Sequence, residues 1–308
     1  MTPCERLAAE ILARGPFRRE ACPFGLIRVT GREAVPFVHG ICSQDLIGAA
    51  PGQVVRAAFL DPKGRVLATC RAVRDDGEAS AGEGGLWLAA EGEQVAAILA
   101  ILDRYHFGEA VLFENVSETC REWIGGEAGP PAGAERRGGG LVLVERRGGV
   151  TLIQAFGAEL PAGLPEAREP ESGEIEALHL LLGLLRAGID TEPSTLALEA
   201  GLDEACSSTK GCYPGQEIVA RIRTYGHVNR SLCLVRIARE DPIAQPVQVL
   251  EPDDGIAVGR VLRAFAPWRG ANVLGVAYLP ADFTEPGTEL RLAGSNDAVS
   301  VLGPSGMS

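Results

Sequence analysis

The sequence lacks any hydrophobic run long enough to cross a membrane. Its longest uncharged apolar stretch, residues 177–185, includes His179 and is well short of the roughly 18 residues that a spanning helix needs. The first twenty residues carry acidic side chains early and no continuous apolar segment, so they predict a short amphipathic helix and not a secretory signal. We therefore expect no membrane partner.

The sequence also lacks the cysteine spacing of a metal site. Its eight cysteines are far apart except for Cys206 and Cys212, and no pair or cysteine–histidine cluster has zinc or iron–sulfur spacing. Such a chain fits the reducing cytoplasm, where most thiols behave as inert small hydrophobic side chains. We expect a cytoplasmic protein without a resident metal.

Positive charge is scarce as well. The chain has 29 Lys and Arg against 41 Asp and Glu, a net charge of −12, which disfavours direct binding to nucleic acid through a basic surface. No Ser/His/Asp order, P-loop or glycine-rich dinucleotide motif is present, so a hydrolase or a nucleotide-binding protein is not indicated. Any anion site must be local.

The first half of the chain alternates predicted strands and helices. Residues 25–29 form a strand, and Thr30 and Glu33 offer a capping box for a helix that Pro36 either kinks or delays. Strands 54–59 and 65–73 form a hairpin through the turn 61–65. A strand over 85–90 precedes an amphipathic helix, whose apolar positions are Val95, Ile98, Leu99 and Leu102.

Further along, glycine and proline mark turns between shorter elements. Residues 125–140 are Gly/Pro-rich and predict a surface loop, whereas strands 141–144 and 150–153 flank a Gly–Gly turn. Residues 175–185 predict a buried helix because they are apolar nearly all round. After Ser231 the chain predicts an all-β module with strands at 232–237, 247–250, 257–262, 273–278 and 289–292.

The segment 207–226 carries the most chemical information. Its glycines and Pro214 hold Cys212 on a tight loop just before a helix in which Glu217 and Arg221 are four residues apart. One interpretation is a structural thiol in a turn beside a surface ion pair. The other is a thiol presented beside an anion-binding cluster, which would consist of Lys210, Arg221, Arg223, His227 and Arg230.

Residues 210–217, Lys-Gly-Cys-Tyr-Pro-Gly-Gln-Glu, resemble the K-G-C-Y-x-G-Q-E signature of the YgfZ family. These are folate-binding relatives of the glycine-cleavage T-protein, and they include mitochondrial iron–sulfur assembly factors. Further similarity lies in residues 27–31, in Ser43-Gln44-Asp45, in the hairpin 61–65, in 102–105 and in 186–188. The resemblance is weakest over residues 115–175.

The resemblance implies an α+β, T-protein-like fold: an N-terminal folate-binding region of two mixed α/β subdomains, residues 1–230, and a C-terminal β-barrel, residues 231–308. It implies a tetrahydrofolate-type cofactor, and iron–sulfur enzymes or assembly proteins as partners, with tRNA modification supported through them. Cys212 is the expected functional thiol, with Lys210 and Glu217 beside it. The expected folate contacts are Tyr213, Gln216, Arg221, Arg223, Arg230, Asp61, Lys63 and Arg186.

Two departures from the T-protein pattern keep other functions open. Residues 87–97 contain neither the asparagine nor the catalytic aspartate of aminomethyltransferases, and only Glu91 or Glu93 could substitute. Arg186 stands where T-proteins carry a pterin-binding glutamate. The alternatives are a folate-dependent aminomethyltransferase or demethylase, and an interaction scaffold that keeps the fold without the ligand. His39, His106 and His179 stand alone in the sequence, and His179 is expected in the core.

Overall fold

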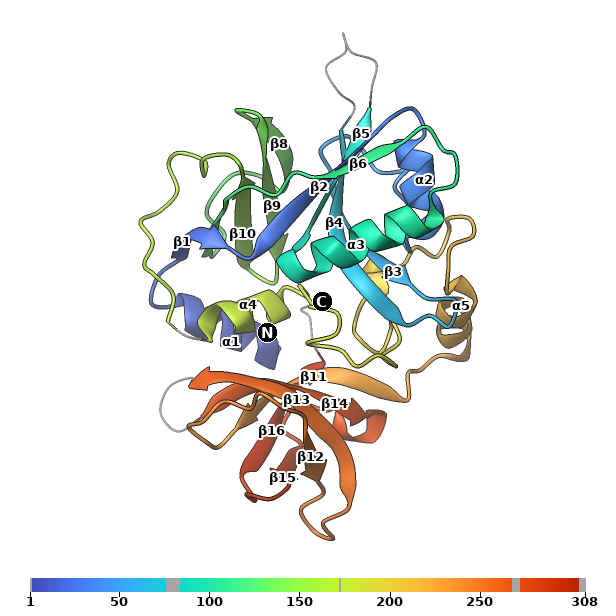
Figure 1. The fold of residues 1–308 in the computed structure, drawn as a ribbon. Coiled ribbons are helices and arrows are strands. Elements are labelled where there is room, and N and C mark those ends of the chain that lie inside the picture. Colours follow the sequence, from blue (N-terminus) through green and yellow to red (C-terminus); the bar gives the residue numbers. More distant parts are fainter. Residues whose placement is uncertain (1, 76–83, 172, 268–271, 305–308) are drawn as a thin grey trace. The chain divides into compact units, whose positions relative to one another are not determined.

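A computed structural model describes residues 2–75, 84–171, 173–267 and 272–304 (Figure 1). The chain divides into two compact units, and neither is continuous in sequence. The motif unit comprises residues 15–169 and 203–221, and the barrel unit comprises residues 1–14, 170–202 and 222–308. The sequence predicts one boundary, between residues 230 and 231, and that boundary stays a prediction.

The first sheet of the motif unit is antiparallel, with strand order β3-β4-β5-β2-β6. Its strands are β2 (Phe24–Thr30), β3 (Val54–Leu60), β4 (Val66–Asp75), β5 (Gly85–Glu91) and β6 (Leu112–Asn115). Because side chains alternate along a strand, every second residue of β2 to β5 joins one core beneath helices α2 (Ala34–Ile41) and α3 (Gly92–Tyr105). Figure 1 shows α3 lying across this sheet. The predicted strands, hairpin and helix of this region are confirmed.

The predicted capping box at the start of α2 is wrong. Thr30 is still part of β2, and Glu33 is the N-cap but caps no helical N–H. The Glu33 carboxylate instead accepts the Ala110 N–H at 2.7 Å, so it ties the helix start to the chain that leads into β6. The later start puts Pro36 inside the first turn, where its missing N–H costs nothing.

The second sheet of the motif unit has strand order β1-β7-β10-β9-β8. Its strands are β1 (Phe17–Cys22), β7 (Cys120–Gly125), β8 (Gly133–Arg137), β9 (Gly140–Arg147) and β10 (Val150–Phe156). The predicted Gly148–Gly149 turn is confirmed, and both residues have positive φ. The loop predicted over 125–140 is partly wrong, because 133–137 pairs with β9 as an edge strand. Its side chains are largely exposed, so it carries no hydrophobic pattern that could have revealed it.

A layer of buried and half-buried polar and charged side chains joins the two sheets of the motif unit. Glu145 on β9 accepts Arg56 from β3 at 3.0 Å and Arg71 from β4 at 3.1 Å. Burial would raise the pKa of Glu145, but the two guanidinium groups outweigh it, and the pKa lies below its ordinary value of 4.5. The full layer consists of Arg19, Arg56, Arg71, Glu122, Glu145 and Gln154.

The barrel unit contains a closed six-stranded barrel, in the order β11-β14-β13-β12-β15-β16. Its strands are β11 (Arg230–Ile237), β12 (Val247–Leu250), β13 (Ala257–Pro267), β14 (Val273–Pro280), β15 (Glu289–Leu292) and β16 (Ala298–Pro304). The predicted all-β module is therefore confirmed, and the strand missing from the prediction, β16, closes the barrel between β11 and β15.

Helices α1 (Pro3–Leu12) and α4 (Glu174–Leu181) also belong to the barrel unit. The predicted N-terminal helix is α1, where Thr2 and Glu5 form a capping box. The predicted buried helix is α4, shorter than expected because Gly183 turns the chain with a φ of 74°. Among the described residues, no helix is both long and apolar enough to span a membrane.

Candidate functional site

Three segments that stand out in the sequence meet in the motif unit. They are the cysteine loop (residues 207–215), the Ser43-Gln44-Asp45 segment after α2, and the hairpin tip (residues 61–65) between β3 and β4. The cysteine loop leads into α5 (Gln216–Tyr225), whose first turn lies near the hairpin tip, with Ile218 next to Gly64. Backbone and side-chain hydrogen bonds hold the first two segments together. The Ser207 N–H donates to the Ser43 carbonyl at 2.8 Å.

Ser43 is the buried link between these segments. Its hydroxyl donates to the Ala205 carbonyl at 2.6 Å and accepts the Ala58 N–H at 2.9 Å. The neighbouring Gln44 amide donates to the Glu204 carbonyl at 2.6 Å. The chain just before the cysteine loop is thereby fixed to both α2 and β3. Sequence reasoning noted the Ser-Gln-Asp segment but could not assign this structural role.

Lys210 is a residue of the cysteine loop, and it is buried. Its ammonium donates to the carbonyl of Cys42 at 2.7 Å, to that of Gln44 at 3.3 Å and to that of His39. Burial lowers the pKa of Lys210 from its ordinary value. The three carbonyl oxygens occupy the three N–H donors of the ammonium, so in this conformation Lys210 ties the loop to the end of α2.

His39 is part of the same structural group, although it stands alone in the sequence. Its Nδ1 atom accepts the Leu46 N–H at 3.3 Å, and its carbonyl receives the Lys210 ammonium. Burial lowers the pKa of His39, and Lys210 lowers it further against the opposing charge of Asp45. Both effects favour the neutral imidazole that the Leu46 hydrogen bond requires.

The hairpin tip and the cysteine loop touch through two glycines. A Cβ added to Gly215, whose φ is 80°, would lie 2.7 Å from the Asp61 carbonyl oxygen and 2.8 Å from the Gly64 Cα. A Cβ on Gly64, whose φ is 75°, would lie 2.9 Å from the Ile218 Cβ. Backbone therefore packs directly on backbone, and the Asp-Pro-Lys-Gly-Arg turn and the Lys-Gly-Cys-Tyr-Pro-Gly-Gln-Glu motif form one structure.

Replacing Gly215 with alanine is expected to lower the free energy of unfolding by more than about 1 kcal/mol, because the side chain adds left-handed strain and a backbone clash. The matched control is Gly211→Ala in the same loop, where φ is not positive and nothing lies within 4 Å of the added Cβ. Urea unfolding of both variants checks this. Equal stability of the two variants would contradict the packing described here.

Cys212 projects from this rigid loop into solvent. All eight cysteines lie in the described part of the chain, and Cys212 alone is exposed, whereas Cys22 is half-buried and the other six are buried. This exposure does not favour the interpretation of Cys212 as a structural thiol packed in a tight turn. Cys212 is therefore accessible to solvent, and the loop that carries it is held in place at Lys210 and Gly215.

The motif residues around Cys212 differ in their surroundings. Tyr213 is buried, with its ring centre 5.1 Å from the Lys210 ammonium. The Gln216 amide donates to the Lys210 carbonyl at 3.4 Å and so closes the loop at the start of α5. Glu217 and Arg221 are both exposed on the first turns of that helix. The buried residues shape the loop, and the exposed ones are accessible to a ligand.

Asp61 and Lys63, the two predicted ligand contacts at the hairpin tip, also differ in their surroundings. The Asp61 carboxylate accepts the backbone N–H groups of Lys63 at 2.8 Å and of Arg65 at 2.9 Å, which is turn chemistry. The Lys63 side chain is exposed at the hairpin tip. Of the predicted ligand contacts in the motif unit, Lys63 and Arg221 are thus the exposed cations.

The remaining predicted contacts belong to the barrel unit. Arg186 lies 3.3 Å from Asp190, a buried carboxylate that also binds Arg263. Arg230 lies over the ring of Tyr278 and 3.8 Å from Glu199. Arg223, in the last turn of α5, is half-buried. Each of Arg186 and Arg230 therefore has an acidic neighbour within its own unit.

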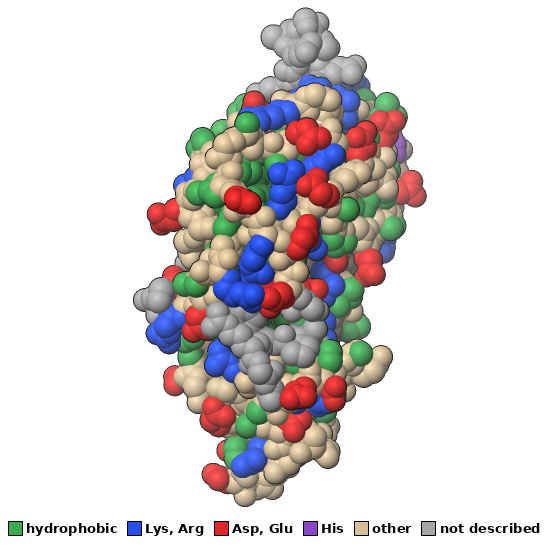
Figure 2. All heavy atoms as spheres, turned by 90° about the vertical axis from the view of Figure 1, so that its left-hand side faces the viewer, with side chains coloured by type: hydrophobic (Ala, Val, Ile, Leu, Met, Phe, Trp, Pro, Cys, Tyr) green, Lys and Arg blue, Asp and Glu red, His purple; other side chains and the backbone are tan. Residues whose placement is uncertain are grey.

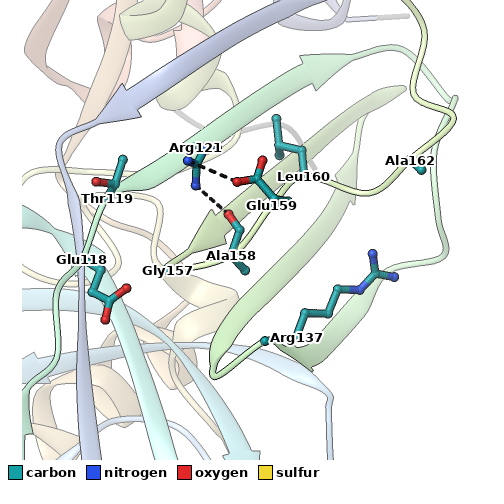
Figure 3. A pocket seen from close by; sticks show the side chains of 10 residues that line it. Glu118, Thr119, Arg121, Arg137, Gly157, Ala158, Glu159, Leu160 and Ala162 are labelled. Carbon is teal, nitrogen blue, oxygen red and sulfur yellow. Dashed lines mark hydrogen bonds and ion pairs between the residues drawn. The ribbon is translucent and has the colours of Figure 1, made fainter.

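A groove of about 940 Å³ lies elsewhere in the motif unit, on the second sheet (Figure 3). Arg121 crosses it, donating to the Ala158 carbonyl at 2.9 Å and pairing with Glu159 at 3.2 Å. The groove shares no residue with the three motif segments. Among the described residues, no group of three or more His, Cys, Asp or Glu side chains could hold a metal ion. The candidate site is therefore the Cys212 surface.

The fold defines the class of protein. The structure superposes on the glycine cleavage system aminomethyltransferase T from Bartonella henselae with a TM-score of 0.71, covering 96% of this chain and 88% of that one at 20% identity. The chain has a T-protein fold of mixed α/β sheets and a C-terminal barrel, as the sequence predicts.

The sequence comparison narrows this class to a family. The human mitochondrial iron–sulfur cluster assembly factor IBA57 is 30% identical over 257 residues, which cover 76% of this chain and 67% of that protein. The chain belongs to the IBA57 family. The Mycosarcoma maydis IBA57 homologue is 25% identical over 235 residues, covering 72% of this chain and 56% of that protein.

The comparisons also include a relative without a functional name. An uncharacterized protein of Haemophilus influenzae is 28% identical over 220 residues, which cover 70% of this chain and 71% of that protein. The chain thus spans between 56% and 71% of the length of these three relatives. No family model matches the chain.

Proposed function

We propose that the protein supports the assembly or repair of iron–sulfur clusters and that Cys212 is its functional thiol. The observation that carries the proposal is that Cys212 is exposed on a loop whose Lys210 ammonium is hydrogen-bonded to the Cys42 carbonyl. The iron–sulfur assembly role named for its relatives supports the same function. A deprotonated thiol is a soft ligand for iron and a nucleophile toward sulfur, so one exposed cysteine suits either task.

The protein works with a partner in this proposal. Clusters are held by several thiolates, and the described residues contain no group of three candidate ligands around Cys212. Cys212 therefore contributes one ligand or one nucleophile, and an iron–sulfur enzyme or assembly protein contributes the rest. The rigid loop lowers the ordering cost of that encounter, because the backbone near the sulfur is already fixed.

The experiment that tests this function is deletion of the gene followed by re-expression of the full chain. Deletion is expected to lower the activity of iron–sulfur enzymes, including tRNA methylthiolases, and re-expression is expected to restore it. Normal activity of these enzymes in the deletion strain would refute the function. If an enzyme that uses iron but no iron–sulfur cluster loses the same share of its activity, the defect is in iron supply and not in cluster assembly.

We further propose a tetrahydrofolate-type ligand, and the exposed cations near the cysteine loop support contacts with its anionic tail. Lys63 and Arg221 are exposed cations on segments that touch, since Gly64 packs on Ile218 one turn before Arg221. They suit the glutamate carboxylates of such a ligand. The Asp61 carboxylate accepts hydrogen bonds from the backbone of its own turn. By the resemblance of the sequence, Arg186 stands where T-proteins carry a pterin-binding glutamate.

Replacing Lys63 or Arg221 with glutamine is expected to weaken tetrahydrofolate binding about tenfold, the loss of one charge-assisted contact. Arg32→Gln, an exposed arginine of the same unit outside these segments, is the matched control and is expected to bind normally. Calorimetric titration measures all three. No response of the native protein to millimolar ligand would favour the scaffold alternative.

A folate-dependent aminomethyltransferase is a second candidate, favoured by the fold of the Bartonella henselae enzyme. It needs a carboxylate aimed at the reacting nitrogens of the folate. Glu91 ends β5 as the N-cap of α3, and Glu93 is exposed in the first turn. Formation of methylene-tetrahydrofolate from an aminomethyl-lipoyl donor by the purified protein would place this candidate first.

In this proposal the protein affects tRNA modification through iron–sulfur enzymes and does not bind tRNA directly. On the face shown in Figure 2, the described basic and acidic side chains are interspersed and form no continuous basic area. Counterion release, which drives non-specific binding to nucleic acid, needs such an area. We propose the cytoplasm as the compartment, whereas the IBA57 relatives compared above are mitochondrial by name.

A further inference from the structure

Two cysteines of the motif unit lie directly opposite each other on neighbouring antiparallel strands. Cys22 is the last residue of the edge strand β1, Cys120 is the first residue of β7, and the two are register partners. The Cα atoms of such partners are about 4.5–5.5 Å apart. That separation lies within the range of about 4.4–6.8 Å found for disulfides. The two thiols are also close enough for Cys22 to raise the pKa of Cys120.

A β-bulge produces this pairing. Arg19 pairs with Glu122 and Cys22 pairs with Cys120, so three steps along β1 match two steps along β7. Without the extra residue, Cys120 would face Ala21. Bulges commonly re-aim a side chain at one point of a sheet. Here the bulge brings one thiol to the other at the end of the ladder.

The two thiols differ in access. Cys22 is half-buried at the sheet edge, whereas Cys120 is buried. Burial raises the pKa of Cys120, and the adjacent Cys22 raises it further. A small oxidant therefore reaches Cys22 first. Cys120 lies between Thr119 and Arg121, which line the groove of Figure 3, so this part of the sheet borders an open surface.

We propose that Cys22 and Cys120 are a reversible redox site, which a small hydroperoxide converts into a cross-strand disulfide. The Cys22 sulfur takes the terminal oxygen of hydrogen peroxide, the O–O bond breaks, and a sulfenic acid and one water form. The Cys120 sulfur then attacks the sulfenic sulfur, the S–S bond forms, and the hydroxyl leaves with the Cys120 proton as a second water. Two thiols lose two electrons, the peroxide gains them, and a dithiol reductant reverses the step.

The position of the bond gives it a structural consequence. The chain passes from the second sheet to the first directly after Cys22 and returns directly before Cys120. The disulfide would therefore close a loop containing all of β2 to β6, including Ser43 and the hairpin tip 61–65. Closing so long a loop restricts the unfolded chain and stabilises the folded motif unit. Oxidation would therefore stabilise the unit that carries Cys212 without modifying Cys212 itself.

The test uses the full chain carrying Cys212→Ser, so that the exposed thiol cannot react. Hydrogen peroxide is expected to remove two hydrogen atoms from the intact mass and to yield one disulfide-linked peptide pair containing Cys22 and Cys120. The melting temperature is expected to rise by about 5 °C and to return after dithiothreitol treatment. Cys22→Ser and Cys120→Ala variants, prepared in the same background, are expected to lose the linked peptides.

Three results would overturn the proposal. They are a link between any other pair, such as the buried Cys42 and Cys70, oxidation of Cys22 to sulfinic acid without a link, and unchanged thiols after peroxide. If a single variant does not fold, peptide mapping of the Cys212→Ser chain alone decides between these outcomes. None of them depends on the proposed iron–sulfur function, since the readouts are mass and stability.

Discussion

Replacing Cys212 with serine is expected to reduce the activity of dependent iron–sulfur enzymes at least tenfold, to the level of the deletion strain. Serine keeps the size and shape of the side chain but is neither a soft iron ligand nor a sulfur nucleophile at neutral pH. Because Cys212 is exposed and its loop is held by Lys210 and Gly215, the substitution should leave the fold intact.

The control for this prediction is Ser208→Ala, another exposed position in the cysteine loop. This variant is expected to support the enzymes as the native chain does. Thermal unfolding of both variants must match that of the native protein, so that loss of function cannot be a loss of folded protein. Full complementation by Cys212→Ser would show that the thiol has no role and would leave only the fold assignment.

Replacing Glu145 with glutamine is expected to lower the free energy of unfolding by about 3–5 kcal/mol, the usual cost of removing one partner of a buried ion pair. The substitution keeps the volume of the side chain but leaves the guanidinium groups of Arg56 and Arg71 without their carboxylate between the two sheets. Urea unfolding at neutral pH measures the effect. Glu135→Gln, which breaks an exposed pair with Arg137, is expected to cost less than about 1 kcal/mol.

The same carboxylate predicts how stability depends on pH. The pKa of Glu145 is below 4.5 in the folded protein, so its contribution is fully present above pH 4.5 and is lost as the pH falls through the folded pKa. The native chain should therefore lose stability more steeply below pH 4.5 than the Glu145→Gln variant. Parallel curves for the two proteins would show that Glu145 does not contribute to the acid sensitivity.

The sequence predicts the fold well where local patterns and burial agree. The hairpin around Asp61, the turn at Gly148 and the strands of the barrel follow directly from alternating apolar residues and turn-forming residues. The prediction failed where tertiary contacts replace the local signal. Glu33 binds Ala110, far along the chain, and β8 is an edge strand held by backbone hydrogen bonds.

In the candidate site, too, the sequence predicts what depends on a local motif and misses what depends on tertiary contacts. The motif identifies Cys212 as the residue of interest, but the sequence cannot show whether a cation next to it in the chain is free. Lys210 is two residues from Cys212 and looks like an electrostatic partner, yet its ammonium is bound to the carbonyls that end α2. That arrangement depends on contacts with residues near position 42, so no local pattern reveals it. The pairing of Cys22 with Cys120 depends on a bulge and is equally invisible.

The discontinuity of the motif unit limits how this protein can be divided. The chain leaves that unit at residue 169 and returns only at residue 203, bringing back the segment that bears Cys212. A recombinant fragment ending at 169 would expose the hydroxyl of Ser43 and the carbonyls around Cys42 to water. A gene fusion or truncation that preserves this unit must therefore keep both of its segments, 15–169 and 203–221, together with the chain that connects them. No single uninterrupted segment of this unit contains both Cys212 and the residues that hold its loop.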